Sequence, residues 1–169
     1  MRVLGIDQSL TSTAWVLVDE DKNVLDSGVI RTTKEDSLPR RCYKICRGLS
    51  EVFRGFEVGH LGMKISIEGL SYGSVGNATR SLGVLMGWIQ SELFTGDNNW
   101  LETPATTLKK FATGNGRAEK QDMLASVPEE FREHIKANYN KSGKKSGLLD
   151  LPDSYWLAIR GVEHFGGKL

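Results

Sequence analysis

Hydrophobic positions along the first thirty residues follow the pattern of strands. Residues 2–7, 14–18 and 24–30 are short runs rich in Val, Leu, Ile and Trp, and polar turns separate them. Connections this short are typical of an antiparallel meander. We therefore expect the chain to begin with three antiparallel strands.

Beyond residue 37 the apolar pattern switches between helix and strand periods. Segment 38–54 has an apolar stripe at helical spacing, segment 64–68 alternates as a strand, and Asn77 is a suitable N-cap for a helix to about Phe94. The later elements that we expect are a strand at 100–102, a short helix from Pro104 to about 113, helices at 118–127 and 129–136, a basic loop at 138–147 and a last helix at 151–165.

This order predicts an α/β fold, with a mixed five-stranded sheet in which the antiparallel meander is joined by parallel strands and helices flank both faces. A right-handed crossover through helix 38–54 would lay strand 64–68 parallel to the first strand. The length of 169 residues, with 39% hydrophobic and 25% charged residues, fits one domain over 1–169. Because no apolar run reaches 18 residues, we expect no membrane span.

Two cysteines, Cys42 and Cys46, fall on the apolar stripe of helix 38–54. Their spacing favours two buried thiols over a zinc site, because no histidine lies nearby in the sequence. Such thiols are typical of a reducing compartment, so we expect an intracellular, cytoplasmic protein.

Two carboxylates end apolar strands. Asp7 closes the segment 3–7 (VLGID), and Glu68 closes the segment 65–68 (ISIE). In parallel neighbouring strands both acids would lie at the carboxyl edge of the sheet, where open α/β sheets bind ligands. A divalent cation would relieve their repulsion. The alternative is that each acid ends its strand in solvent.

Asp150 and Asp153 are three residues apart at the start of the last helix, and this spacing places both on one face. With Pro152 in the first turn, the pattern is also typical of an N-terminal cap. Capping and metal binding remain compatible, because a helix N-terminus favours carboxylates.

The segment 112–120 contains Gly114 and Gly116 and enters a helix. Such a loop can present backbone N–H groups to a phosphate, although most loops of this kind are turns. Its basic neighbours favour an anionic partner; they are Lys109, Lys110, Arg117 and Lys120.

Together these segments resemble the RuvC family of Holliday-junction resolvases, in the RNase H-like nuclease superfamily. The resemblance is carried in order along the chain by residues 3–7 with Ser9 and Thr13, residues 65–68, loop 113–120, and residues 150–153 leading into 157–159. It implies an RNase H-like fold and an endodeoxyribonuclease of DNA recombination and repair. It also implies a homodimer that binds branched DNA and resolves four-way junctions by paired nicks.

The resemblance further implies a centre that binds two Mg²⁺ or Mn²⁺ ions through Asp7, Glu68, Asp150 and Asp153. By position in the loop motif, Lys109 and Lys120 would contact the scissile strand, and Lys120 would take part in catalysis. The family inserts an aromatic residue into the junction, for which Tyr72 is the candidate. The other residues that we expect to contact DNA are Lys110, Arg117, Asn77 and Arg80.

The sequence departs from the family pattern in three places. Gln8 stands where the family has a proline or a small residue, residues 154–156 (SYW) replace small residues, and the loop from Glu68 to Tyr72 is longer. These departures indicate a divergent branch, such as a viral one acting in an infected host cell.

Gly83 and Gly87 lie four residues apart on the helix from Asn77, which would let another backbone approach closely. That backbone could belong to a second copy, as the resemblance favours, or the glycines could pack on the chain's own sheet.

Two other functions remain open. A phosphotransferase or ATPase of the actin-like superfamily fits residues 5–7 followed by Ser9, Thr11 and Thr13, although that fold needs two such domains. A noncatalytic module for branched DNA would keep the sheet without the chemistry, but all four acids are present.

The charge distribution is uneven. There are 22 basic and 21 acidic residues, a net charge of +1, yet residues 109–147 hold nine basic and five acidic side chains. The near-neutral total therefore excludes only a uniformly basic protein and leaves a local basic surface for phosphate.

Overall fold

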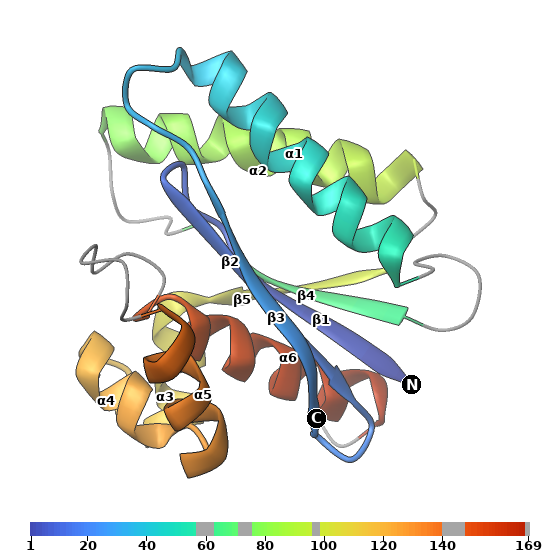
Figure 1. The fold of residues 1–169 in the computed structure, drawn as a ribbon, viewed down its shortest axis with the longest axis vertical. Coiled ribbons are helices and arrows are strands. Elements are labelled where there is room, and N and C mark those ends of the chain that lie inside the picture. Colours follow the sequence, from blue (N-terminus) through green and yellow to red (C-terminus); the bar gives the residue numbers. More distant parts are fainter. Residues whose placement is uncertain (57–62, 71–75, 96–98, 140–147, 168–169) are drawn as a thin grey trace.

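Five strands form one mixed sheet in the computed structural model, which describes residues 1–56, 63–70, 76–95, 99–139 and 148–167 (Figure 1). Their order across the sheet is β3-β2-β1-β4-β5. The strands are β1 (Arg2–Asp7), β2 (Ser12–Asp19), β3 (Val24–Arg31), β4 (Met63–Gly69) and β5 (Trp100–Pro104). The first three are antiparallel neighbours, whereas β4 is parallel to β1 and β5 is parallel to β4. The predicted mixed sheet is confirmed.

The register of β1 and β4 places two acids side by side. Ile6 pairs with Ile67, so Asp7 and Glu68 follow at equivalent positions on adjacent strands. Neighbouring strands lie about 4.8 Å apart, which is close enough for two carboxylates to interact strongly. The right-handed crossover expected from the sequence therefore brings the two strand ends together.

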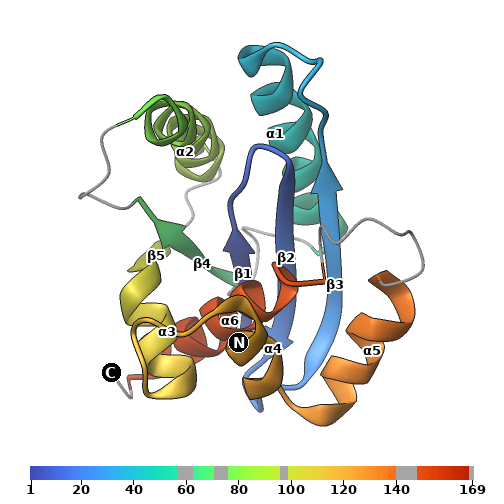
Figure 2. The ribbon, with the colours of Figure 1, turned by 90° about the vertical axis from the view of Figure 1, so that its left-hand side faces the viewer.

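Alternation along the strands decides which face these acids occupy. Leu4, Ile6 and Ile67 belong to a core with the helices α1 (Leu38–Gly55) and α2 (Asn77–Thr95). Val3 is an odd number of residues from Leu4 and Ile6, so its side chain lies on the opposite face of the sheet, where it packs against α6 (Leu151–Phe165). Side chains two residues apart share a face, so Asp7 and Glu68 lie on the α6 face. Figure 2 shows α1 and α2 on one side of the sheet and α6 on the other.

Three shorter helices complete the α6 side of the molecule: α3 (Ala105–Thr113), α4 (Lys120–Ser126) and α5 (Glu129–Tyr139). The expected helix at 118–127 is shorter, because Glu119 is the extended N-cap of α4 and Val127 is its C-cap. The predicted start of the loop at residue 138 is wrong, because α5 continues to Tyr139. The rest of the predicted loop, residues 140–147, lies outside the described residues.

Asn77 is the first residue of α2 and not its N-cap. The first helical hydrogen bond runs from Arg80 N to the Gly76 carbonyl, so Gly76 occupies the N-cap position. Cys42 and Cys46 are buried free thiols, as predicted. Within the described residues, no helix is both long and apolar enough to cross a bilayer.

Candidate active site

Four carboxylates from three parts of the chain line one cleft. Asp7 ends β1, Glu68 lies near the end of β4, and Asp150 and Asp153 flank the start of α6. The cleft has a volume of about 290 Å³, and Lys109 and Lys120 also line it. These six side chains therefore line one cleft, as the sequence predicts. A larger hollow of about 400 Å³ lies between the start of β3 and α5, and none of the predicted site residues lines it.

The start of α6 reaches the acids because α6 crosses β1 at very short range. The backbone N–H of Asp7 donates to Ser154 Oγ at 3.3 Å, and this hydrogen bond is buried. Ser154 Oγ in turn donates to the Asp150 carbonyl at 3.3 Å. Ser154 therefore joins the end of β1 to the first turn of α6, a role that the sequence did not reveal.

Burial and mutual repulsion make three of the acids hard to ionise. Burial, followed by the charges of Glu68 and Asp153, raises the pKa of Asp7 well above its ordinary value. Burial and then Asp153 raise the pKa of Glu68 to about 7, against the opposing effect of Lys109. The pKa of Asp153 is raised to about 6, mainly by burial. Hydrogen bonding to Asp7 lowers the pKa of Glu68 but does not outweigh burial.

Asp150 stands at the N-cap position of α6 but forms no side-chain cap hydrogen bond with the described backbone. Its carboxylate instead accepts a hydrogen bond from Lys120 Nζ at 2.5 Å. The capping interpretation therefore does not hold for Asp150. Burial lowers the pKa of Lys120, but the hydrogen bond and charge of Asp150 outweigh it and raise that pKa overall.

The chemistry of this cleft fits a divalent cation. Its lining offers oxygen ligands that are costly to charge without a counterion. Asp153 Oδ1 is buried and, among the described residues, has no hydrogen-bond partner. In the described ranges no three acids or histidines are grouped tightly enough to enclose one ion as they stand. Ion binding would therefore require side-chain adjustment, for example release of Asp150 by Lys120.

The glycine-bearing loop does not form a backbone phosphate cradle. Asn115 N donates to Thr113 Oγ1, Arg117 N to Asn115 Oδ1, and Ala118 N to the Asn115 carbonyl. These N–H groups close the turn, and Glu119 N donates to Asp122 in a capping box for α4. The loop contributes Lys120 to the site and not its own amides.

The other predicted DNA contacts lie outside the cleft lining. Lys110 and Arg117 are exposed near the loop, and Asn77 and Arg80 are exposed in the first turn of α2. Tyr72, the predicted junction-inserting residue, lies outside the described residues.

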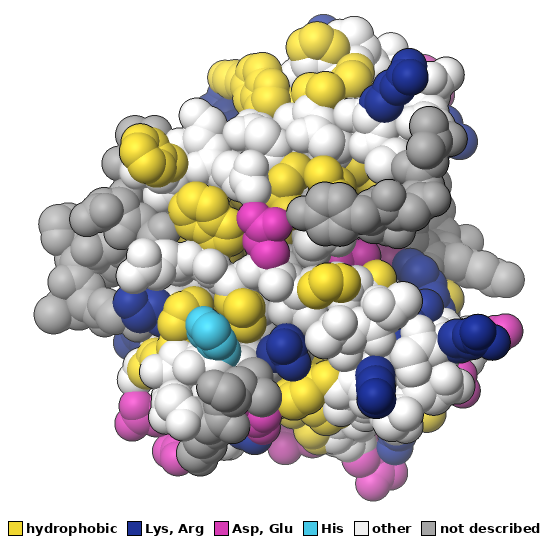
Figure 3. Space-filling model, turned by 180° about the vertical axis from the view of Figure 1, so that it is seen from behind, with side chains coloured by type: hydrophobic (Ala, Val, Ile, Leu, Met, Phe, Trp, Pro, Cys, Tyr) yellow, Lys and Arg dark blue, Asp and Glu magenta, His cyan; other side chains and the backbone are white. Residues whose placement is uncertain are grey.

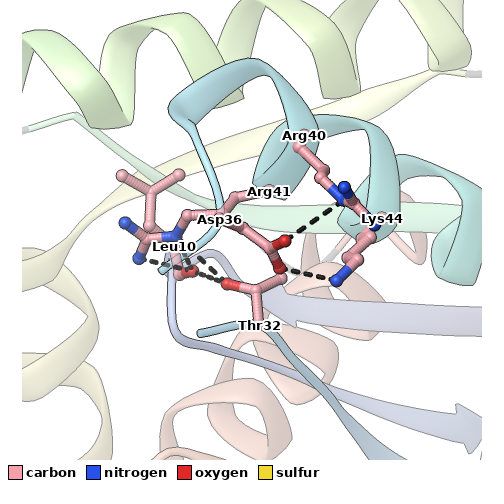
Figure 4. Close-up of polar contacts among 6 residues, drawn as sticks. All are labelled: Leu10, Thr32, Asp36, Arg40, Arg41 and Lys44. Carbon is pink, nitrogen blue, oxygen red and sulfur yellow. Dashed lines mark hydrogen bonds and ion pairs between the residues drawn. The ribbon is translucent and has the colours of Figure 1, made fainter. Parts of the chain in front are cut away.

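The turn after Asp7 contains two features that sequence reasoning missed. Gln8 is buried in the cleft wall and donates from Nε2 to the Glu68 carbonyl at 3.0 Å. The Leu10 carbonyl accepts hydrogen bonds from Arg41 Nε and Nη2, at 3.0 and 2.7 Å, and from Thr32 Oγ1 (Figure 4). The only signal in the sequence was that Gln8 departs from the family pattern.

A family model described as crossover junction endodeoxyribonuclease RuvC matches residues 3–133. The chain belongs to the RuvC family. Among curated relatives, a RuvC from Orientia tsutsugamushi (strain Boryong) is 30% identical over 144 residues, covering 83% of this chain and 87% of the relative. A RuvC from Neorickettsia sennetsu is 33% identical over 129 residues, covering 73% and 75%.

Solved structures show the same RuvC architecture. Thermus thermophilus RuvC superposes with a TM-score of 0.70 at 16% identity, covering 99% of this chain and 98% of that one. The Fowlpox virus resolvase in complex with substrate Holliday-junction DNA gives 0.62 at 14% identity, covering 98% and 99%. At these identities the likeness concerns the fold, and it confirms the expected RNase H-like class.

Proposed function

We propose that this chain is a metal-dependent, structure-selective endonuclease that resolves four-way DNA junctions. The observation that carries the proposal is the cleft in which four acids meet Lys109 and Lys120. Membership of a family of crossover junction endodeoxyribonucleases supports the same reaction and argues against the phosphotransferase alternative. Relatives of the same fold have been solved with Holliday-junction DNA.

We assign Asp7, Glu68, Asp150 and Asp153 as the ligands of two Mg²⁺ or Mn²⁺ ions. When bound, such a pair of ions supplies an activated water and stabilises the leaving oxygen of an in-line displacement. The carboxyls must release their protons to act as ligands, so their raised pKa values link metal binding to proton release. Asp7 and Glu68 lie on strands, and Asp153 lies in the first turn of α6 with Asp150 at its N-cap position. Such regular elements hold ligands more firmly than loops would.

Two lysines of the cleft would act on the phosphate. Lys120 is held beside Asp150, and Lys109 lines the same cleft from α3. A positive charge fixed next to a scissile phosphate stabilises the additional negative charge of the transition state. The exposed Lys110, Arg117, Asn77 and Arg80 would contact more distant backbone of the branched DNA.

The proposed enzyme is a homodimer joined through α2, because a four-way junction has near two-fold symmetry. Val84, Trp88 and Phe94 of α2 are exposed although they are large and apolar. Seen from behind, hydrophobic side chains occur on the upper part of the surface, on the side where α2 lies (Figure 3). A Cβ atom on Gly87 would meet nothing within 4 Å among the described residues, so packing on the chain's own sheet does not explain this glycine.

The test compares cleavage and binding of a four-way junction by the wild type and by Asp7→Asn. We expect the wild type to nick the junction with Mg²⁺ and to stop when EDTA is added. Asp7→Asn should bind the junction but leave it uncut, while Asp21→Asn, in the exposed turn before β3, should cut normally. Mg²⁺-dependent nicking by pure Asp7→Asn would refute the assignment. Tight binding without cleavage by the wild type would support the noncatalytic alternative.

A further inference from the structure

Gln8 occupies an unusual position for a polar side chain. It follows directly after Asp7, lines the cleft of the four acids, and has only 9% of its surface exposed. The turn that it begins is fixed on both sides, because Thr13 Oγ1 donates to the Ser9 carbonyl at 2.7 Å and Arg41 holds the Leu10 carbonyl. The side chain is therefore held in the wall of the cleft.

The hydrogen bond from Gln8 Nε2 to the Glu68 carbonyl determines which way the amide faces. The opposite orientation would set two acceptor oxygens against each other, so the nitrogen must face Glu68. The other end of the amide, Oε1, is then directed elsewhere. It is fully enclosed and has no hydrogen-bond partner within the described ranges.

An enclosed acceptor without a donor costs free energy, and a bound water or ion is one of the ways in which such an atom acquires a partner. Four side chains of the described chain have an atom of this kind: Gln8, Ser12, Ser66 and Asp153. Of these, only Gln8 and Asp153 line the cleft. One of these two oxygens belongs to Asp153, a proposed metal ligand. The other belongs to Gln8, whose amide nitrogen holds the main chain of Glu68, a second proposed ligand.

We propose that Gln8 is a positioning residue of the metal centre. Its amide nitrogen holds the main chain at Glu68, and its amide oxygen accepts a hydrogen bond from a water bound to a divalent cation. Partners of this kind orient the ligands of a metal and commonly change its affinity by about 10- to 100-fold. The inference rests on the proposed function, because it needs a metal at the four carboxylates. A proline or small residue at position 8 provides neither contact.

The experiment measures Mn²⁺ binding to the full-length protein by isothermal titration calorimetry, without DNA. Gln8→Met keeps the approximate volume of the side chain and removes both amide groups. Ser12→Ala is the matched control, because it removes another enclosed oxygen without a partner, from β2 and away from the cleft. We expect Gln8→Met to bind Mn²⁺ at least tenfold more weakly and to lose kcat with little change in KM, while Ser12→Ala matches the wild type.

A second measurement uses the wild type and does not depend on the folding of a variant. The chain has three glutamines, at positions 8, 90 and 121, so ¹⁵N-glutamine labelling gives three side-chain amide signals, assigned by Gln90→Leu and Gln121→Leu. Titration with Mg²⁺ should shift the Gln8 signal and leave that of Gln90, which is bonded to Glu102, unchanged.

These measurements distinguish failure of the proposed metal centre from failure of the role of Gln8. If the wild type binds neither Mn²⁺ nor Mg²⁺, the proposed metal centre itself is refuted. If the wild type binds metal but the Gln8 signal does not move, or if folded Gln8→Met binds Mn²⁺ as tightly as the wild type, the role of Gln8 alone is overturned.

Discussion

A Cβ atom built on Gly5 would lie 2.0 Å from the carbonyl oxygen of Ser154 and 2.5 Å from the backbone nitrogen of Ala158. Strand β1 and helix α6 therefore touch through their backbones. At Gly161, one turn further along α6, an added Cβ atom would lie 2.6 Å from Cγ1 of the Val3 side chain. This contact sets the depth at which Asp153 enters the cleft beside Asp7.

Gly5→Ala should therefore destabilise the protein strongly, because the added methyl group meets backbone atoms that cannot move aside. We expect a loss of roughly 3 kcal/mol or more in the free energy of unfolding, measured by urea denaturation. Gly55→Ala, at the last residue of α1, is the control, since its side chain would meet nothing within 4 Å among the described residues. Because alanine loses less backbone entropy than glycine in a helix, this variant should be as stable as the wild type or more stable by up to about 1 kcal/mol. Equal urea midpoints for wild type and Gly5→Ala would contradict the close contact.

The raised pKa values of the cleft predict how stability depends on pH without metal. Glu68, with an ordinary pKa of 4.5, keeps its proton in the folded protein up to about pH 7. Because the unfolded chain releases that proton earlier, the stabilisation is complete below about pH 4.5 and is lost as the pH rises through 7. Glu68→Gln cannot ionise, so its melting temperature should match the wild type at pH 4 and exceed it at pH 8.

Divalent cations provide the complementary measurement. Mg²⁺ competes with the protons of the cleft, so it should raise the wild-type melting temperature more at pH 8 than at pH 5. Glu51→Gln, on the exposed face of α1, should follow the wild type throughout. A pH-independent difference between Glu68→Gln and the wild type would show that Glu68 is not the titrating group.

The position of the main site was predictable because it follows from strand geometry. Asp7 and Glu68 end apolar strands, and a single right-handed crossover makes those strands parallel neighbours. The side on which the acids lie also follows from alternation with Ile6 and Ile67. These are local patterns combined with one topological rule, so the sequence contains enough information to predict them.

The partners of individual polar groups were not predictable in the same way. Lys120 pairs with Asp150 across 30 residues, and Gln8 donates to the carbonyl of Glu68 across 60. The sequence left open whether the amides of loop 114–119 face a phosphate or close a turn, and in the structure they donate to oxygens of Thr113, Asn115 and Asp122. Such contacts depend on tertiary packing and on side-chain rotamers, which leave no periodic signal in the sequence.

Arg41 should be important for stability although it lies on α1, outside the cleft. Its guanidinium donates twice to the Leu10 carbonyl and once to Thr32 Oγ1, and so ties the turn after Asp7 to the start of α1. Arg41→Met should cost roughly 1.5–3 kcal/mol, the usual range for hydrogen bonds to a charged group, as measured by urea denaturation. It should also slow junction cleavage, because the turn that begins at Gln8 would lose its anchor.

The neighbouring arginine provides a matched control for this prediction. Arg40 has 69% of its side chain exposed and pairs with Asp36, as Lys44 does (Figure 4). Exposed pairs of this kind contribute little, so Arg40→Met should change stability by less than about 0.5 kcal/mol. If the two variants behave alike, the bonds to Leu10 do not hold the turn.

The exposed apolar side chains of α2 lead to a prediction about assembly. Trp88 has 41% of its surface exposed, and it lies one helical turn from Val84, which is also exposed. A tryptophan near the centre of an interface commonly contributes 2 kcal/mol or more, so Trp88→Glu should raise the dimer dissociation constant by at least about 30-fold. Sedimentation at micromolar concentration would then show wild-type dimers and mutant monomers. Tyr43→Glu is the control, because Tyr43 is an aromatic residue on α1 that is even more exposed, at 54%, and its replacement should leave the dimer intact. A wild type that sediments as a monomer even with junction DNA would exclude a dimer, and a Tyr43→Glu monomer would move the interface from α2 to α1.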